Sequence, residues 1–162
     1  MTVKTQPESR PTLRPLPDAD VLSFLYLEAR LADEGLIEEE LSYSVIGAFY
    51  EVYNTLGYGF LEHIYTAALE QELIARGHTV QRELTVHVHY KGRLVGTHPL
   101  DMVVDDKLTI ENKATHMLLR RDTRQLYNYL KATRFEVGLL LHFGPEPGFH
   151  RIICRNSKKS FG

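Results

Sequence analysis

The stretch from residue 97 to residue 114 constrains the fold most, because it predicts two short strands joined by a tight turn. The strands are predicted at residues 99–104 and 108–113, and each mixes apolar with polar side chains. Residues 105–107, Asp-Asp-Lys, lie between them and have the composition of a turn. The segment therefore predicts a β-hairpin.

Three charged side chains lie on this predicted hairpin. Side chains alternate between the two faces of a strand, so Glu111 and Lys113 are expected to project in the same direction. Antiparallel pairing through the short turn is expected to bring Asp101 near Glu111. Two carboxylates suit Mg²⁺ or Mn²⁺ better than zinc, and a neighbouring lysine can polarise water or offset charge on a phosphoryl transition state. A solvated hairpin is the alternative interpretation of this stretch on its own.

Length and composition favour one globular domain with an appendage: 162 residues, 43% of them hydrophobic and 25% charged. The formal net charge of −2 gives no global basic signature for nucleic acid. The lone cysteine, Cys154, excludes an intrachain disulfide and fits a reducing compartment. No apolar run approaches the roughly 20 residues that span a bilayer, and the N-terminus lacks the apolar segment of a secretory signal. We therefore predict a cytoplasmic protein with no membrane partner.

The N-terminal region differs in composition from the rest of the chain. Residues 1–17 carry four of the seven prolines and predict a flexible N-terminal arm. Residues 18–38 predict a helical appendage, which is either a packing element or a contact in a homo-oligomer. The main domain is predicted at residues 39–156, followed by a polar tail at residues 157–162.

Two helices are predicted at the start of the main domain. The first covers residues 39–56, where apolar side chains recur at steps of three and four. The second runs from about Leu61 to Arg76 and ends at Gly77. Glu62 lies in its first turn, where the helix dipole favours a carboxylate, so a role as a first-turn acid is the simplest interpretation.

The remaining elements predict an α/β domain with a mixed sheet of four or five strands flanked by helices. Residues 79–90 alternate with period two, which is typical of a half-buried strand. A helix is predicted at residues 122–131. An almost continuously apolar strand is predicted at residues 135–143, in the centre of the sheet, and a last strand at residues 149–155.

Three motifs occur in a specific order on these elements. Gly59, Glu62 and Tyr65 form a G-x-x-E-x-x-Y string, the hairpin carries D-x9-E-x-K, and Gln125 and Tyr129 form a Q-x-x-x-Y string. This combination resembles the GxxExxY protein family, a branch of the PD-(D/E)XK nuclease superfamily, over about residues 41–155. The resemblance implies a restriction-endonuclease-like core.

The resemblance also implies the roles of the hairpin residues. Asp101 and Glu111 are expected to bind Mg²⁺ or Mn²⁺, with the backbone carbonyl of Asn112 as a third ligand. Glu62 is expected to complete the site, and Lys113 is expected to be the catalytic lysine. Asn112 stands where an apolar residue is commoner in the family, so its side chain needs a partner if it is buried. There is a second departure from the PD-(D/E)XK pattern, in which a proline directly precedes the aspartate. Here Leu100 stands between Pro99 and Asp101.

The helix at residues 122–131 is expected to face the substrate. The resemblance implies that Gln125 supports the catalytic site and that Tyr129 faces nucleic acid; one helical turn separates them, so both can share a face. Residues 116–134 are locally basic, with Asp122 as their only acid. They form either a phosphate-contacting surface or a solvated helix face. The basic residues in question are Arg120, Arg121, Arg124, Lys131 and Arg134.

Two functions from different classes fit these observations. The first is a Mg²⁺-dependent nuclease that hydrolyses phosphodiester bonds, with DNA as the expected nucleic acid. The second is a non-catalytic module of the same fold that binds nucleic acid or a partner protein. The intact set of Asp101, Glu111 and Lys113 favours the enzyme, and the weak net basicity favours the binding module. His87 and His89 could bind zinc, but no third ligand is evident near them in the sequence.

Overall fold

The structure is a computed structural model, and it describes residues 37–159. The predicted N-terminal arm at residues 1–17 and nearly all of the predicted helical appendage lie outside the described residues. Within them, the three α-helices are α2 (Glu39–Leu56), α3 (Glu62–Ala75) and α4 (Arg120–Lys131), and Asn156–Lys158 form one 3₁₀ turn. The strands are β1 (Val80–Tyr90), β2 (Arg93–Val104), β3 (Leu108–Lys113), β4 (Val137–His142) and β5 (Gly148–Ile153). None of the helices in this part of the chain is long and apolar enough to span a bilayer.

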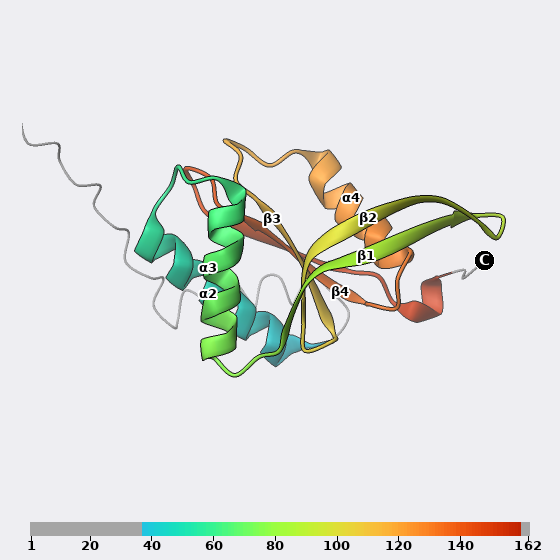
Figure 1. The fold of residues 1–162 in the computed structure, drawn as a ribbon, viewed down its shortest axis with the longest axis horizontal. Coiled ribbons are helices and arrows are strands. Elements are labelled where there is room, and N and C mark those ends of the chain that lie inside the picture. Colours follow the sequence, from blue (N-terminus) through green and yellow to red (C-terminus); the bar gives the residue numbers. More distant parts are fainter. Residues whose placement is uncertain (1–36, 160–162) are drawn as a thin grey trace, which may run out of the picture.

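The five strands form one mixed sheet in the order β1-β2-β3-β4-β5. All neighbours are antiparallel except β3 and β4, which run parallel and are connected through α4. Helices α2 and α3 pack on one face of the sheet and α4 packs on the other (Figure 1). The predicted mixed sheet flanked by helices is therefore confirmed, with five strands.

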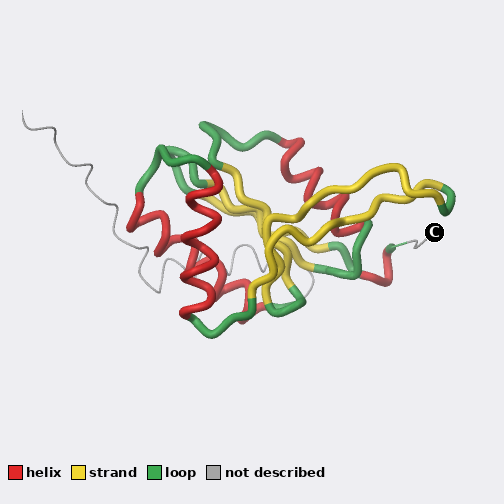
Figure 2. Tube along the Cα trace, in the orientation of Figure 1, coloured by secondary structure: helices red, strands yellow, loops and turns green. Residues whose placement is uncertain are grey.

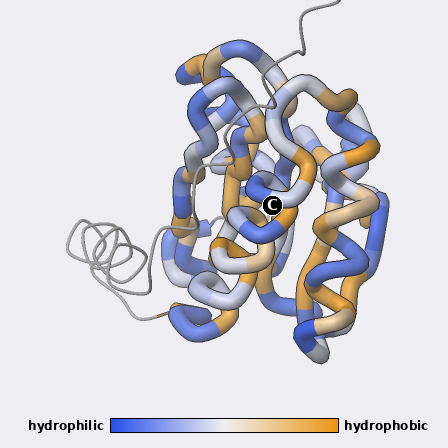
Figure 3. The backbone as a smooth tube through the Cα atoms, turned by 90° about the vertical axis from the view of Figure 1, so that its left-hand side faces the viewer, coloured by the Kyte–Doolittle hydropathy of each residue, from blue (hydrophilic) through white to orange (hydrophobic). Residues whose placement is uncertain are grey.

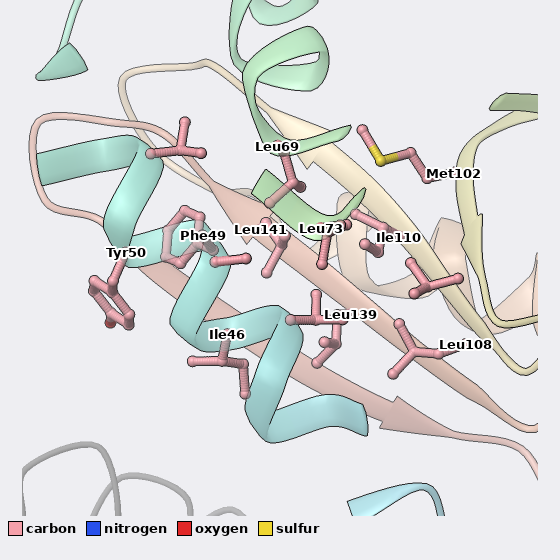
Figure 4. Packing of buried hydrophobic residues seen from close by; sticks show 14 of the residues in the cluster. Ile46, Phe49, Tyr50, Leu69, Leu73, Met102, Leu108, Ile110, Leu139 and Leu141 are labelled. Atoms are coloured by element: carbon pink, nitrogen blue, oxygen red, sulfur yellow. The ribbon is translucent and has the colours of Figure 1, made fainter. Parts of the chain in front are cut away.

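The larger hydrophobic core lies between the sheet and the α2–α3 layer (Figure 4). The apolar stripe predicted for residues 39–56 faces this core, since Val45 and Phe49 are fully buried and Phe49 packs edge-on against Phe143. Hydrophilic and hydrophobic residues alternate along the helices in Figure 3, as expected for amphipathic helices that cover a sheet. Strand β4 is buried along its whole length, which confirms the predicted central strand.

Strand β2 is longer than the sequence predicted. It begins at Arg93 rather than at residue 99, because β1 offers a pairing partner along almost its whole length. Only residues 102–104 of β2 also pair with β3. The rest of the β1–β2 ribbon projects beyond the sheet, as the long paired strands in Figure 2 show. We call residues 84–100, which form this projecting ribbon, the arm.

The ribbon changes direction where the arm joins the sheet. Glu83 has a left-handed backbone (φ 57°), and the β1–β2 ladder omits the pair that it would form with Asp101. A second hydrophobic core lies between the sheet and α4, and Leu100 belongs to it. Met102 belongs to the larger core under α2 and α3. Residues two apart on a regular strand share a face, so β2 reverses the faces of its side chains between Leu100 and Met102. Asp101 lies at this reversal.

A cluster of polar side chains joins three separate elements on the α2–α3 side. The His78 ring lies 2.7 Å from the Ser44 hydroxyl of α2 through Nε2, and 2.7 Å from an Asp105 carboxylate oxygen through Nδ1. Asp105 also accepts a hydrogen bond from the backbone N–H of Thr79 at 2.8 Å. The cluster thus ties α2, the α3–β1 loop and the β2–β3 turn together.

Candidate active site

The β2–β3 hairpin brings the two predicted acidic residues together. Met102 pairs with Ile110, so the register places Asp101 across from Glu111. An Asp101 carboxylate oxygen accepts a hydrogen bond from the backbone N–H of Asn112 at 2.7 Å. This contact holds the Asp101 side chain over the neighbouring strand.

Glu111 is a buried carboxylate with one oxygen left unpaired. Adjacent side chains of a strand point to opposite faces of the sheet. Ile110 lies in the core under α2 and α3, so the side chain of Glu111 lies on the α4 face. Glu111 is only 5% exposed, and its Oε1 lies 3.2 Å from the Lys113 ammonium. Its Oε2 has no hydrogen-bond partner within residues 37–159. Burial and the nearby Asp101 charge raise the pKa of Glu111 to about 7.

Opposing effects act on the other two charged groups of the site. Burial raises the pKa of Asp101, although the hydrogen bond from Asn112 and the charge of Lys113 act in the other direction. Burial lowers the pKa of Lys113, but the carboxylates of Glu111, Glu62 and Asp122 together outweigh this effect, and the net direction is upward. The environment of Lys113 therefore favours the charged ammonium.

The Asn112 side chain points away from these groups into the opposite core. It is fully buried, and its amide nitrogen donates a hydrogen bond to the Thr66 hydroxyl of α3 at 3.1 Å. Thr66 is thus the partner that the sequence required but did not identify. The amide oxygen of Asn112 has no partner among the described residues.

Glu62 is the first residue of α3 and lies at the end of β3. One of its carboxylate oxygens accepts a hydrogen bond from the backbone N–H of Ala114 at 3.2 Å. Its charge also contributes to the raised pKa values of Glu111 and Lys113. Glu62 is thus both a first-turn acid and a neighbour of the hairpin carboxylates.

Helix α4 places Gln125 and Tyr129 on the same side as the hairpin groups. The Gln125 amide donates a hydrogen bond to the Tyr129 hydroxyl at 2.6 Å. Burial raises the pKa of Tyr129, and the Glu111 charge adds to this effect. The helix begins two residues earlier than predicted, because the Asp122 carboxylate accepts a hydrogen bond from the backbone N–H of Leu119 and so caps the first turn.

His98 is a neighbour of the site that the sequence analysis missed. It lies at the base of the arm and stacks on Tyr129, with ring centroids 3.9 Å apart and an interplanar angle of 13°. Its Nε2 is buried without a hydrogen-bond partner among residues 37–159. Burial lowers the pKa of His98, while the Asp101 charge acts against this. No motif marks this histidine; its position three residues before Asp101 was the only available signal.

The three predicted arginines lie outside this constellation. Arg120, Arg121 and Arg124 are exposed on the first turns of α4. Arg124 lies over the Tyr127 ring, 5.8 Å from its centroid, and no contact joins any of the three to Asp101, Glu111 or Lys113 among the contacts that the described residues show. The three arginines therefore lie at the exposed start of α4 and make no direct contact with the described residues of the site.

The residues present fit a divalent cation held by few protein ligands. Between residues 37 and 159, no three His, Cys, Asp or Glu side chains converge closely enough to hold a metal by themselves. Two carboxylates do converge, and the free Oε2 of Glu111 is a buried acceptor that lacks a donor. Burial and the repulsion from Asp101 raise the pKa of Glu111, and a cation would offset both effects, so the donor set suits Mg²⁺ or Mn²⁺ completed by water.

Comparisons with known proteins define the class. The family model described as "PD-(D/E)XK nuclease superfamily" matches residues 39–152, and the chain belongs to that superfamily. The predicted restriction-endonuclease-like α/β core is thereby confirmed. A solved structure described as "Crystal structure of SSO0001" is 18% identical, covers 84% of this chain and 77% of its own, and gives a TM-score of 0.49. A comparison with curated proteins finds no match.

Proposed function

We propose that the protein is a metal-dependent nuclease of the GxxExxY branch that hydrolyses phosphodiester bonds in DNA. The observation that carries this proposal is the buried Glu111 carboxylate, which has one free oxygen, faces Asp101 and contacts the Lys113 ammonium. A buried carboxylate oxygen without a hydrogen-bond partner destabilises a fold, so its presence is best explained by a ligand that completes it. Membership of the nuclease superfamily supports the same conclusion.

Asp101 and Glu111 would hold the cation, with the backbone carbonyl of Asn112 as a further ligand. Glu62 would complete the set at its outer edge. When bound, Mg²⁺ or Mn²⁺ would lower the pKa of water and stabilise charge on the phosphate. The hydrogen bond from Asn112 fixes the Asp101 carboxylate before any ligand arrives, so this side chain loses little conformational entropy on binding.

The remaining residues act on the substrate. The Lys113 ammonium is positioned beside Glu111 to offset the negative charge that develops as the phosphodiester is attacked. Gln125 and Tyr129 support the site from α4 through their mutual hydrogen bond. Arg120, Arg121 and Arg124 supply positive charge for phosphates farther from the scissile bond.

Cleavage and metal binding together test the proposal. Linear, nicked and single-stranded DNA are incubated with Mg²⁺ or Mn²⁺ and either the natural chain or the Asp101→Ala, Glu111→Ala double variant. We expect only the natural chain to cleave and, in calorimetry, only the natural chain to bind Mn²⁺. A Glu40→Ala, Asp106→Ala variant removes two exposed carboxylates and should behave as the natural chain does. Equal Mn²⁺ binding by all three proteins would contradict the site.

A non-catalytic binding module of the same fold is the second candidate. The observation that favours it is that, among the described residues, no three His, Cys, Asp or Glu side chains converge closely enough to hold a metal by themselves. Nucleic-acid binding by the natural chain without cleavage of any substrate in either metal would support this candidate. A cytoplasmic location and a homo-oligomeric state stay predictions.

A further inference from the structure

The arm is a two-stranded ribbon whose outer part is exposed. Its tip is a two-residue turn with left-handed backbone at Lys91 (φ 48°) and Gly92 (φ 75°), the geometry that matches the twist of paired strands. Its base is fixed by Val86, which is buried in the core under α4 together with Leu126 and Leu130. From residue 89 to residue 97 every residue is exposed. The arm therefore combines a fixed base with a free outer half.

The arm carries positive charge and no acid. Residues 84–100 contain Lys91 and Arg93 at the tip, three histidines, and neither aspartate nor glutamate. Residues 116–134, which include α4, add five basic side chains against Asp122 alone. The arm and α4 contact each other through the shared core and through the stack of His98 on Tyr129. Both basic segments therefore belong to the same side of the domain, the side of α4.

The candidate active site lies on this side of the domain. Asp101 directly follows the arm in β2, and Glu111 and Lys113 lie on the face of the sheet that α4 covers. Arg93 precedes Asp101 by eight positions along β2, which corresponds to roughly 26 Å at about 3.3 Å per residue. A duplex that lay along the arm from the site would meet the tip about 8 base pairs away, at 3.4 Å per pair.

We propose that the arm binds double-stranded DNA beside the cleavage site, with Lys91 and Arg93 contacting its phosphates. This inference rests on the proposed function, because it takes the substrate of that site as its ligand. The major groove of B-form DNA admits a two-stranded β-ribbon, whereas that of A-form RNA is too deep and narrow for side chains to read. The arm therefore favours a DNA duplex over an RNA duplex.

A second copy of the chain is the competing occupant. Leu94 and Val95 are 54% and 62% exposed, and an apolar ribbon with free edges can pair with another chain. Two such arms would, however, place basic tips and acid-free strands against one another, which is unfavourable. Charge complementarity therefore selects a polyanion.

Salt-dependent binding tests the arm. Fluorescence anisotropy is measured in the cleavage-deficient Lys113→Met background with a 24-base-pair DNA duplex, an RNA duplex of the same sequence and single-stranded DNA. The variant is Lys91→Ala, Arg93→Ala. Losing two phosphate contacts should lower the slope of log affinity against log salt by about 1.8 and weaken DNA-duplex binding by about 10-fold or more at 0.1 M salt. A smaller effect is expected on the RNA duplex and on the single strand.

The control removes the same charge from the other side of the molecule. Arg76→Ala, Lys107→Ala takes away two exposed cations that lie near Glu72 and Glu38, and it should leave affinity and slope unchanged. Unchanged DNA binding by the arm variant would overturn the proposal, as would an equal loss on RNA. A dimer in sedimentation that Leu94→Thr, Val95→Thr dissociates, with DNA affinity unaffected, would also overturn it.

Two results separate the arm from the catalytic site. If the natural chain cleaves DNA and the arm variant binds and cleaves equally well, the arm inference is wrong and the proposed nuclease stands. If the Lys113→Met protein binds duplex in an arm-dependent way and the natural chain cleaves nothing, the proposed catalysis is wrong and the arm stands. Circular dichroism of each variant verifies that the fold is retained.

Discussion

The two sides of the domain differ in charge and in what they contribute: α2 and α3 form an acidic layer, and α4 and the arm form a basic layer. Residues 39–75, which contain α2 and α3, carry six glutamates and neither lysine nor arginine. Residues 84–100 and 116–134, the arm and the α4 region, carry seven basic side chains and one acid. The acidic layer covers the larger core, and the basic layer covers the face that bears Glu111 and Lys113.

This difference shows why the net charge misleads. A total of −2 hides two regions of opposite sign, and a polyanion responds to the local potential near the site. If the protein binds nucleic acid as proposed, the acidic layer would disfavour contact on the α2–α3 side. We therefore expect that substitutions in the basic layer change binding and cleavage, and that matched substitutions of exposed glutamates in the acidic layer, Glu62 excepted, change neither.

The largest effect is expected from Lys113→Met. This change keeps the aliphatic stem and removes the ammonium beside Glu111, so cleavage should fall by about 1,000-fold with affinity little changed. Single-turnover kinetics and anisotropy measure the two quantities separately. Lys107→Met, an exposed lysine on the β2–β3 turn, serves as the control. Cleavage by Lys113→Met at the rate of the natural chain would falsify the assignment of the site.

The second effect concerns stability without metal. The pKa of Glu111 is raised from 4.5 to about 7, so the folded state is penalised as the pH rises through this range, and the full penalty is present above it. Glu111→Gln removes the charge and should raise the free energy of unfolding by up to about 3 kcal/mol at pH 8, with little difference at pH 4. Urea denaturation in EDTA at both pH values measures this. Glu40→Gln, on the exposed side of α2, should change stability by less than about 0.5 kcal/mol at either pH.

The reverse result for Glu111 would be equally informative. A destabilised Glu111→Gln protein at pH 8 would mean that the carboxylate supports the fold through its contact with Lys113. Added Mg²⁺ should stabilise the natural chain and not Glu111→Gln, because a ligand that binds only the folded state shifts the unfolding equilibrium.

The third effect compares the two layers directly. Replacing Arg120, Arg121 and Arg124 with alanine should lower the salt slope of DNA binding by about 2.7 if each contacts one phosphate. Replacing Glu40, Glu51 and Glu72 with glutamine changes the net charge by the same amount in the opposite direction and should leave the slope unchanged. Equal and opposite changes in the two variants would show that only the total charge matters.

How far the sequence predicts this structure depends on whether an element is determined locally. The apolar stripe of α2 and the apolar run of β4 were sufficient to predict these two elements. A helix buried on one face repeats apolar residues every three or four positions, and a strand buried on both faces is apolar throughout, so each pattern can be recognised within a short stretch of sequence. The start of β2 was wrong by six residues, since Gly96, Thr97 and Pro99 are poor indicators of a strand whose length is set by its partner β1.

The site follows the same division. The hairpin predicted that Asp101 and Glu111 meet, because the turn between them fixes the register. The contacts of Asn112 with Thr66 and of His98 with Tyr129 join residues 46 and 31 positions apart. No local pattern predicts such pairs; they depend on how α3 and α4 pack on the sheet.

The smallest effect is expected in the polar cluster on the acidic side. Hydrogen bonds from His78 and Thr79 lower the pKa of Asp105, against the effect of burial, so the stabilisation is present above pH 4 and is lost as the pH falls further. Asp105→Asn should cost about 1 kcal/mol at pH 7 and nothing near pH 2. Thermal unfolding at both pH values measures this. Asp106→Asn, the exposed neighbour on the same turn, is the control, and a loss of the same size there would show that the turn charge and not the cluster is responsible.

The hydrogen bonds of the site imply an order of assembly during folding. Asp101 and Asn112 are 11 residues apart, whereas Glu62 and Ala114 are 52 apart. The entropy cost of closing a loop rises with its length, and hairpins form within microseconds, so the paired carboxylates can meet within the hairpin alone. Glu62 joins them only after α3 has docked on the sheet. A partly folded chain would therefore already present the acidic pair, while the complete constellation exists only in the finished domain.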